Sequence, residues 1–267
     1  MSNRITRVFD ELQTGNKKAL IAFITGSDPD IETTEALILA MEEAGADIIE
    51  IGIPFSDPVA EGTVIQEASA RALGAGCTVD KLFDMVQRLR EKTNIPLLFM
   101  TYANPIYAYD KERFVATCKL VGIDGIIVPD VPFEEKDEFE DVCNCYGIQL
   151  ISLIAPTSGE RAKEIALGTQ GFLYCVSSLG VTGTRCDINT NIAELIAQVK
   201  KVSSIPCAVG FGISTPKQAR DMAAISDGVI VGSAIVKLIA EFGKDSVAPV
   251  KDFVGKMKAE LKSSYIL

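Results

Sequence analysis

Two glycine-centred loops near the C-terminus have the composition of a phosphate-binding site. Gly210–Ser214 follows the apolar run Ile205–Val209, and Gly232–Ala234 follows the apolar run Gly228–Val231; both runs are typical of buried strands. Each loop leads into a helical pattern, so backbone N–H groups at the two helix starts are available to one anion. We therefore predict that the chain handles a phosphorylated small molecule. Tight strand-to-helix turns without a ligand are the alternative.

Two carboxylates are the candidates for proton transfer. The chain contains no histidine, so acid–base chemistry near neutral pH falls to carboxylates, Tyr, Cys, Lys or water. Glu50 is the only acid in the apolar segment Ile48–Ile53, and burial there would raise its pKa towards that of a useful general acid. Glu61 lies in the proline-containing loop that follows, and the two carboxylates would titrate apart in different environments. A structural salt bridge at Glu50 and a solvated loop acid at Glu61 are the alternatives.

The segment Ser177–Arg185 is rich in Gly, Ser and Thr, a composition typical of a mobile lid over an active site. Gly183 within it offers a further backbone donor for phosphate, although a plain connecting loop is the alternative. Lysine is a poor candidate for covalent chemistry, because none stands at the end of a predicted strand and Lys237 falls inside a helical pattern. A Schiff-base aldolase is therefore disfavoured.

An alternation of apolar and amphipathic segments positions these residues. Eight apolar runs are predicted as strands: Ala19–Thr25, Asp47–Ile51, Pro96–Thr101, Gly125–Val128, Gln149–Ile154, Phe172–Val176, Ile205–Val209 and Gly228–Val231. The predicted helices are Arg4–Leu12, Ile31–Glu43, Val79–Lys92, Lys111–Val121, Glu134–Tyr146, Glu160–Leu167, Ile192–Val202, Pro216–Ala224 and Val247–Leu261. This order predicts an α/β fold, a closed (β/α)8 TIM barrel with an extra N-terminal helix, whose active site lies at the C-terminal ends of the strands. An open doubly wound sheet is the alternative, but residues 25–29 match its glycine fingerprint poorly.

Length and composition indicate a single enzyme-like domain spanning residues 1–267. The chain is 48% hydrophobic and 23% charged, without the apolar stretch of roughly 18 residues that a membrane span needs. Its net charge of −10 argues against nucleic acid or an anionic membrane as a partner. The N-terminus lacks a secretory or transit pattern, so we expect a cytoplasmic protein. The seven cysteines form no C-x-x-C pair, so neither disulfides nor a metal site is predicted.

Four segments resemble the tryptophan synthase alpha chain family: Ile49–Pro58 (IEIGIPFSDP), Leu179–Gly183 (LGVTG), Val209–Ile213 (VGFGI) and Val231–Ala234 (VGSA). The match spans nearly the whole chain, and the run Glu-x-Gly-x-Pro-Phe-Ser-Asp-Pro is highly specific to that family. The resemblance implies a lyase that cleaves indole-3-glycerol phosphate into indole and glyceraldehyde 3-phosphate. It implies a retro-aldol reaction that uses neither a Schiff base nor a metal.

The resemblance also implies roles for individual residues. Glu50 would protonate indole C3 and handle the proton of the glycerol hydroxyl, and Glu61 would accept a hydrogen bond from the indole N–H. Tyr174, the third catalytic residue, would lie beside the substrate, and Thr182 would close over the site and reach Glu61. The implied substrate pocket consists of Phe23, Met100, Tyr102, Asp130, Thr182 and Ile230, and the implied phosphate site of Gly183, Phe211, Gly212, Gly232 and Ser233.

The implied partner is a tryptophan synthase beta subunit, in an alpha2-beta2 tetramer for L-tryptophan biosynthesis. Indole would pass through a tunnel to that subunit, which holds the pyridoxal phosphate of the second reaction, so no cofactor is expected in this chain. By the same resemblance, loops around Asp57–Pro58 and Asn104–Pro105 would contact the partner.

Three positions depart from the family pattern. Glu61 stands where aspartate is usual, Thr63 where proline is usual, and Ser178 where many members carry arginine. The extra methylene of Glu61 moves the same charge outward, and a misplacement of about 1 Å costs on the order of 10²-fold in rate. Two alternatives therefore accompany the subunit role: a stand-alone lyase that releases indole freely, and a regulatory subunit that binds ligand without catalysis.

Overall fold

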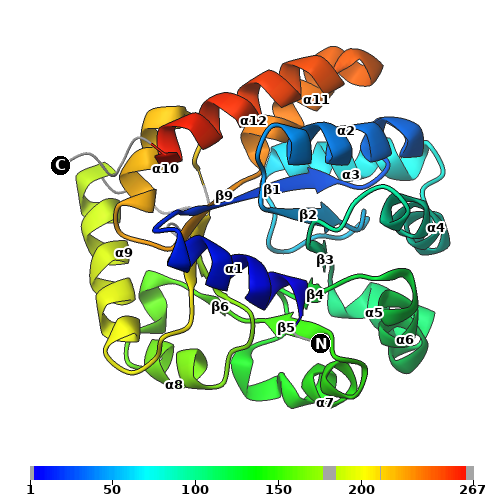
Figure 1. Ribbon diagram of the computed structural model, residues 1–267. Coiled ribbons are helices and arrows are strands. Elements are labelled where there is room, and N and C mark those ends of the chain that lie inside the picture. The colour runs from blue at the N-terminus through cyan, green and yellow to red at the C-terminus, as the bar shows by residue number, and fades with distance from the viewer. Residues whose placement is uncertain (1–2, 177–184, 211, 263–267) are drawn as a thin grey trace.

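A closed parallel barrel forms the centre of the computed structural model, which describes residues 3–176, 185–210 and 212–262 (Figure 1). The strands are β1 (Ala19–Thr25), β2 (Ile48–Gly52), β3 (Leu97–Met100), β4 (Gly125–Ile127), β5 (Gln149–Ile151), β6 (Leu153–Ile154), β7 (Leu173–Val176), β8 (Cys207–Gly210) and β9 (Gly228–Val231). They are arranged in the order β5-β4-β3-β2-β1-β9-β8-β7-β6, with parallel pairing throughout. Only Ser152 separates β5 from β6, and its carbonyl accepts a hydrogen bond of 3.0 Å from the Tyr174 N–H. The two pieces therefore act as one strand that closes the predicted TIM barrel.

Helices surround the barrel and follow most of the strands (Figure 1). The α-helices are α1 (Arg4–Thr14), α2 (Ile31–Glu43), α3 (Thr63–Gly74), α4 (Val79–Arg90), α5 (Ala103–Tyr109), α6 (Lys111–Val121), α7 (Asp137–Tyr146), α8 (Arg161–Leu167), α9 (Arg185–Lys200), α10 (Pro216–Ala223), α11 (Ser233–Phe242) and α12 (Val247–Lys262). Short 3-10 turns are η1 (Phe133–Glu135), η2 (Pro156–Ser158) and η3 (Gly243–Asp245). No helix among the described residues is long and apolar enough to cross a membrane.

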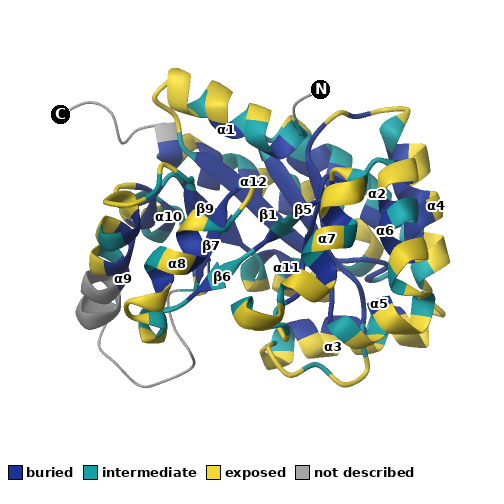
Figure 2. Cartoon of the chain, turned by 90° about the horizontal axis from the view of Figure 1, so that it is seen from below, coloured by how far each residue is buried: buried dark blue, intermediate teal, exposed yellow. Residues whose placement is uncertain are grey.

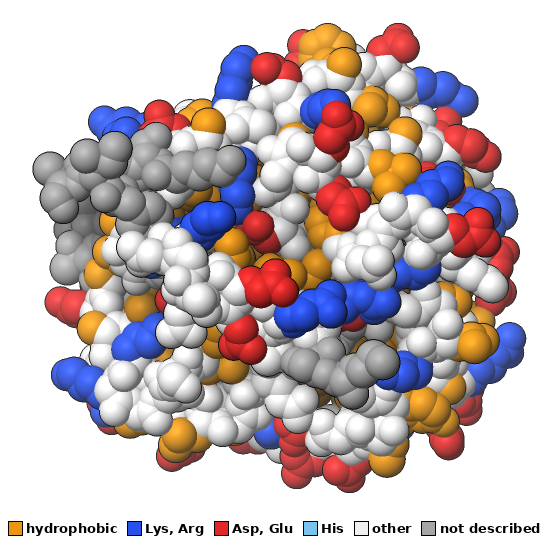
Figure 3. Space-filling view, in the orientation of Figure 1, with side chains coloured by type: hydrophobic (Ala, Val, Ile, Leu, Met, Phe, Trp, Pro, Cys, Tyr) orange, Lys and Arg blue, Asp and Glu red, His pale blue; other side chains and the backbone are white. Residues whose placement is uncertain are grey.

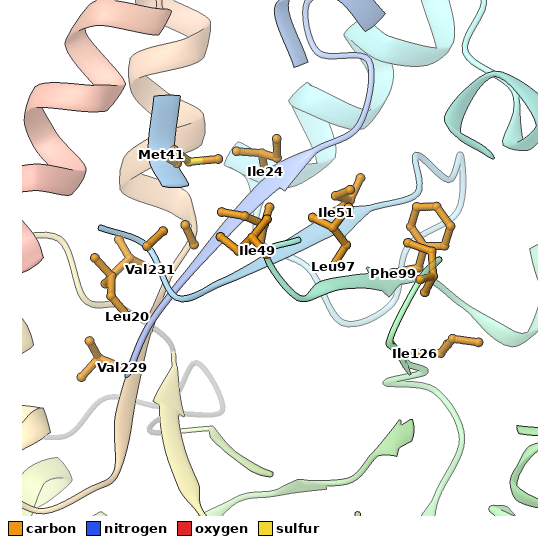
Figure 4. Close-up of a cluster of buried hydrophobic side chains, with 14 of the residues drawn as sticks. Leu20, Ile24, Met41, Ile49, Ile51, Leu97, Phe99, Ile126, Val229 and Val231 are labelled. Carbon is orange, nitrogen blue, oxygen red and sulfur yellow. The ribbon is translucent and has the colours of Figure 1, made fainter. Parts of the chain in front are cut away.

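Strand alternation divides the apolar side chains into two cores. One set points into the barrel and includes Ala19, Ile21, Ile48, Leu98, Ile127, Ile151, Phe172, Ala208 and Ile230. The other set points outward and packs against the helices, as Leu20, Ile49, Leu97, Phe99 and Val229 do in Figure 4. Because every strand is buried on both faces, the sequence of each strand is an almost continuous apolar run.

The two ends of the barrel are closed by different helices. Ile5 and Phe9 of α1 pack into the interior core at the N-terminal ends of the strands, where the Phe9 and Phe172 ring centroids lie 5.6 Å apart. At the other end, Ile65 and Ala68 of α3 pack on Phe23 of β1. Figure 2 shows α1 and α3 at these opposite ends. The loop that carries Glu61 leads directly into α3 and is therefore held at the C-terminal mouth.

Most predicted boundaries agree with the structure. The bounds of β1, β9, α2 and α6 are those expected, whereas α9 begins at Arg185, seven residues before the predicted start at Ile192. The segment predicted as one helix, Glu134–Tyr146, is divided into η1 and α7. Helices α3 and α5 were not predicted. Neither carries a side-chain N-cap hydrogen bond, because Gly62 precedes α3 and Tyr102 precedes α5, so the usual start signal is missing.

A buried ion cluster ties α1 and α4 to the N-terminal end of the barrel. Asp124, which is 4% exposed and precedes β4, pairs with Arg4 and with Arg90, each at 2.9 Å. The same carboxylate accepts a hydrogen bond of 3.0 Å from the Leu97 N–H of β3. Elsewhere on the face that α1 crosses, Lys and Arg side chains are interspersed with acids (Figure 3). Asp124 therefore links two helices to two adjacent strands.

We expect Asp124→Ala to lower the free energy of unfolding by roughly 3 kcal/mol, because two partly buried guanidinium groups lose their counter-charge. Urea denaturation followed by circular dichroism measures the change. Glu11→Ala, which removes an exposed acid 3.8 Å from Arg7, is the matched control and should leave the midpoint unchanged. Equal midpoints for Asp124→Ala and the wild type would contradict the structural role of the cluster.

Candidate active site

Glu50 is a buried carboxyl group inside the barrel. It lies in the middle of β2, with Phe23 of β1 and Leu98 of β3 as its neighbours in register. The side chain has the same orientation as Ile48, which belongs to the interior core, and its residue is 0% exposed. Neither carboxyl oxygen has a hydrogen-bond partner among the described residues. Burial alone raises the pKa of Glu50 to about 8, so the group is a protonated acid at neutral pH.

Tyr174 faces the same interior space from β7. Its ring belongs to the interior core, and its pKa is raised well above the ordinary value, first by burial and then by the charge of Glu50. The two groups are therefore electrostatic neighbours inside the barrel. Gly210 of the adjacent strand makes room for the phenol, because a Cβ on Gly210 would lie 2.6 Å from the Tyr174 hydroxyl oxygen.

An apolar wall adjoins Glu50 on the β1 side. Phe23 packs with Met100 beneath α3, and Ile230 of β9 belongs to the interior core beside Ile21. Gly52 and Gly232 leave space for the Phe23 ring, since a Cβ on Gly52 would lie 2.7 Å from the Phe23 Cζ and one on Gly232 would lie 3.2 Å from the ring. The structure thus brings three predicted pocket residues together around the acid.

Glu61 lies at the barrel mouth, close to Tyr102. One carboxyl oxygen, Oε2, is buried without a hydrogen-bond partner among the described residues. Burial raises the pKa of Glu61, and the nearby Tyr102 side chain opposes that shift. The Tyr102 hydroxyl accepts a hydrogen bond of 3.1 Å from the N–H of Ala60, the residue before Glu61. The second carboxylate is therefore partly buried, in a loop that contacts the residues following β3.

Asp130 lies on the outer side of Tyr102. It is exposed, and both carboxylate oxygens accept hydrogen bonds from the Ala103 N–H, at 3.1 and 3.2 Å. Its carboxylate thus satisfies a backbone donor at the start of α5, directly after Tyr102. Its observed contact is with the helix start beside Tyr102.

The glycine loops converge on the C-terminal end of the barrel. Gly212 adopts φ 74°, a left-handed conformation that favours glycine. Gly232 precedes α11 without a side-chain cap, which leaves the first-turn N–H groups of that helix without a capping side chain. Ser233 is the exposed first residue of α11. The backbone N–H groups at the start of α11 lie beside the Phe23 ring, because Gly232, which precedes the helix, is next to that ring. Thr182, Gly183 and Phe211, which the sequence also places in the site, lie outside the described residues.

Two contributions to the site were not predicted from the sequence. Gly210 accommodates the Tyr174 ring, and Gly52 accommodates the Phe23 ring. The feature of the sequence that could have indicated both is a glycine at the end of an otherwise apolar strand. The hydrogen bond from the Ala60 N–H to the Tyr102 hydroxyl joins two loops 42 residues apart. No local pattern encodes such a contact.

Comparisons with known proteins identify the family of the chain. The model of the tryptophan synthase alpha chain family matches residues 9–264. The tryptophan synthase alpha chains of Caldanaerobacter subterraneus subsp. tengcongensis and Clostridium kluyveri are 49% and 44% identical to this chain, over 97% of it and 100% of each relative.

Solved structures extend the likeness to the fold. Tryptophan synthase subunit alpha from Legionella pneumophila str. Paris has a TM-score of 0.91 at 36% identity, covering 98% of this chain and 100% of that one. A chain of the tryptophan synthase complex from Pyrococcus furiosus has a TM-score of 0.83 at 36% identity, with 91% and 99% covered. The chain therefore belongs to the tryptophan synthase alpha chain family, the lyases that cleave indole-3-glycerol phosphate.

Proposed function

We propose that Glu50 is the proton donor and Glu61 the second carboxylate in the retro-aldol cleavage of indole-3-glycerol phosphate. The observation that carries this assignment is the fully buried, unpartnered Glu50 carboxyl inside the barrel. Its raised pKa of about 8 keeps a proton available at neutral pH, which a general acid needs. The alternative role, a structural salt bridge, lacks support because no counter-charge in the described part of the chain lies within hydrogen-bonding distance of either oxygen.

In this proposal Glu50 delivers its proton to indole C3. The bond between C3 and the glycerol carbon then breaks, and the glycerol hydroxyl proton returns to the Glu50 carboxylate as the aldehyde forms. One proton leaves Glu50 and one comes back, so the acid is regenerated in each turnover. Tyr174, held protonated by its raised pKa, lies beside Glu50 as a hydrogen-bond donor for the substrate.

Glu61 serves the other side of the indole ring. Positive charge develops on the ring when C3 is protonated, and an ionised carboxylate near the ring N–H stabilises that charge. The unpartnered Oε2 of Glu61 is an acceptor available to such a donor. Phe23, Met100 and Ile230 supply the apolar wall against which the ring stacks.

The phosphate end is assigned to the loops after β8 and β9. A helix start directs backbone N–H groups at an anion, and the N-terminus of α11 is preceded by glycine without a capping side chain. We assign Gly212, Gly232 and Ser233 to this end, together with Gly183 and Phe211, and Thr182 to the closing segment. Asp130 and Tyr102 complete the assigned pocket at the end of β3.

We further propose that a beta subunit docks on the loops beside Glu61, in an alpha2-beta2 assembly that takes up indole from this chain. A hollow of about 300 Å³ lies there, lined by Ile53, Pro54, Phe55, Leu73, Cys77, Thr78, Val79, Asn104, Pro105 and Ala108. Val59 in the adjoining loop is 79% exposed, and a partner seated on this loop would cover it. Pyridoxal phosphate is assigned to the partner, and none of the residues described above is assigned to hold it. A cytoplasmic location fits this biosynthetic role.

Indole release from indole-3-glycerol phosphate, measured with and without a tryptophan synthase beta subunit, tests the function. We expect slow release by the chain alone, faster release with the partner, and a loss of at least 10²-fold in Glu50→Gln, because the amide has no proton to deliver. Glu11→Gln is the exposed control. Full activity without the partner would favour a stand-alone lyase, and no indole in either condition, with ligand still bound, would favour a regulatory subunit.

The pKa of Glu50 also predicts a pH dependence of stability. Its ordinary pKa of 4.5 rises to about 8 in the folded chain, so between these values the folded state holds a proton that the unfolded state has released. This contribution to stability is complete below about pH 4.5 and is lost as the pH rises to about 8. We expect the wild type to lose stability relative to Glu50→Gln across this window in urea denaturation. A stability difference independent of pH would mean that Glu50 is ionised in the folded chain.

Glu61→Asp tests whether the longer carboxylate is catalytically competent. The shorter side chain withdraws the carboxylate from Tyr102, so we expect kcat/KM to fall by roughly tenfold. Glu67→Asp, the same change at an exposed position on α3, is the control and should leave kcat/KM unchanged. A large gain in turnover for Glu61→Asp would support the regulatory alternative instead.

A further inference from the structure

A two-pronged ion pair joins α3 to the loop that follows β1. The guanidinium group of Arg71 donates two hydrogen bonds to the carboxylate of Asp28, from Nε to Oδ1 at 2.9 Å and from Nη2 to Oδ2 at 2.8 Å. Arg71 lies in the last turn of α3, and Asp28, which is 1% exposed, lies between β1 and α2. Two parallel hydrogen bonds fix the orientation of the two groups as well as their distance.

The loop that carries Asp28 is itself held by the barrel and by α2. The Gly26 N–H donates a hydrogen bond of 2.8 Å to the carbonyl of Gly52 in β2. The Ser27 N–H donates a hydrogen bond of 3.0 Å to the hydroxyl of Thr34 in α2. Both bonds are made by the backbone just before Asp28, so this carboxylate is a fixed point to which a helix can be attached.

The apolar face of α3 gives the helix little other support against sliding or rotation. Its buried residues are Ile65, Ala68, Ser69 and Ala72. Ile65 and Ala68 pack on Phe23, but an alanine methyl buries little apolar area and so adds little to the free energy that holds the helix in one place. The helix also begins without a side-chain cap. The ion pair therefore supplies the directional contact that this face lacks.

The other end of α3 is joined to the backbone of Glu61. The side-chain amide of Gln66 donates a hydrogen bond of 2.8 Å to the Glu61 carbonyl. The N–H groups of Ile65 and Gln66 both donate to the carbonyl of Gly62, each at 3.1 Å. Gln66 and Arg71 are about 7.5 Å apart along the helix axis, a distance over which a hydrogen-bonded helix moves as one body. A displacement of α3 at Arg71 therefore displaces Glu61.

We propose that Arg71 is a positioning residue, which holds α3 through its ion pair with Asp28 and, through α3, holds the Glu61 carboxylate at the barrel mouth. The inference rests on the proposed function for its kinetic consequence. Arg71 acts through the helix and not on the substrate. The competing role is that of a surface ion pair that contributes only to the overall stability of the chain, since the Arg71 side chain is 37% exposed.

Arg71→Lys keeps the positive charge and loses the two-pronged geometry, because an ammonium group is a point charge. We expect kcat to fall by roughly tenfold with a smaller change in KM, because Glu61 is displaced while the loops assigned to phosphate lie on other elements. Arg88→Lys is the matched control and should leave kcat unchanged. Arg88 of α4 pairs with Glu35 of α2 at 3.2 Å, so this ion pair joins two other helices.

A double-mutant cycle separates action through Glu61 from a general effect on the enzyme. In a Glu61→Gln background, Arg71→Lys should cause almost no further loss of kcat, because the carboxylate whose position it sets is absent. An equal loss of kcat in both backgrounds would overturn the proposal. Circular dichroism melting of each variant shows whether it is folded at the assay temperature.

Native-state hydrogen exchange tests the anchoring of α3 without using catalysis. In Arg71→Lys we expect the amides of Ile65 and Gln66 to exchange roughly tenfold faster than in the wild type, with no change at Phe114 of α6, whose N–H bonds the Asp110 carbonyl. Unchanged exchange in α3, or equal acceleration at Phe114, would overturn the proposal. If the wild type releases no indole, the proposed function fails, and the exchange still decides whether Arg71 holds α3. If the wild type releases indole and the cycle is additive, only the positioning role fails.

Discussion

The burial of an unpartnered carboxyl at Glu50 is the constraint on which the rest of the site depends. A charged carboxylate in an apolar interior is costly, and a protein avoids that cost by keeping the group protonated. The barrel meets this condition by surrounding Glu50 with apolar neighbours such as Phe23 and Leu98. A cation placed beside Glu50 would stabilise its ionised form and would remove the proton that its proposed role needs. Under that proposal, the apolar interior serves catalysis as well as stability.

Stability and chemistry are separated along the barrel axis. At the N-terminal ends of the strands, α1 closes the interior and Asp124 joins two guanidinium groups to the backbone of β3. At the C-terminal ends, the Glu50 carboxyl and one oxygen of Glu61 have no hydrogen-bond partner among the described residues, and glycines replace larger side chains so that the Phe23 and Tyr174 rings fit. Barrels commonly place stabilising contacts at the N-terminal face and the active site at the C-terminal face.

The sequence predicted the barrel because its strands are buried on both faces and thus read as continuous apolar runs. Glu50 was detectable for the same reason, as the single acid within such a run. The contact of Asp130 with the start of α5 was not predicted, nor were α3 and α5 themselves, whose starts lack capping hydrogen bonds from their N-cap residues. The contact between the Tyr102 hydroxyl and the Ala60 N–H could not be predicted, because it depends on how two loops pack at the barrel mouth.

The two carboxyl groups differ in what acts on them, and this difference fits the roles proposed for them. Burial is the single cause that raises the pKa of Glu50 to about 8. Burial also raises the pKa of Glu61, but there the nearby Tyr102 side chain opposes the shift. A group with no stabilising partner keeps its proton, and a group with a donor gives its proton up more readily. The proposed cleavage of indole-3-glycerol phosphate needs one of each: an acid at C3 and an ionised acceptor for the ring N–H. The opposing effect at Glu61 limits the rise of its pKa and so favours the ionised form that the proposed role needs.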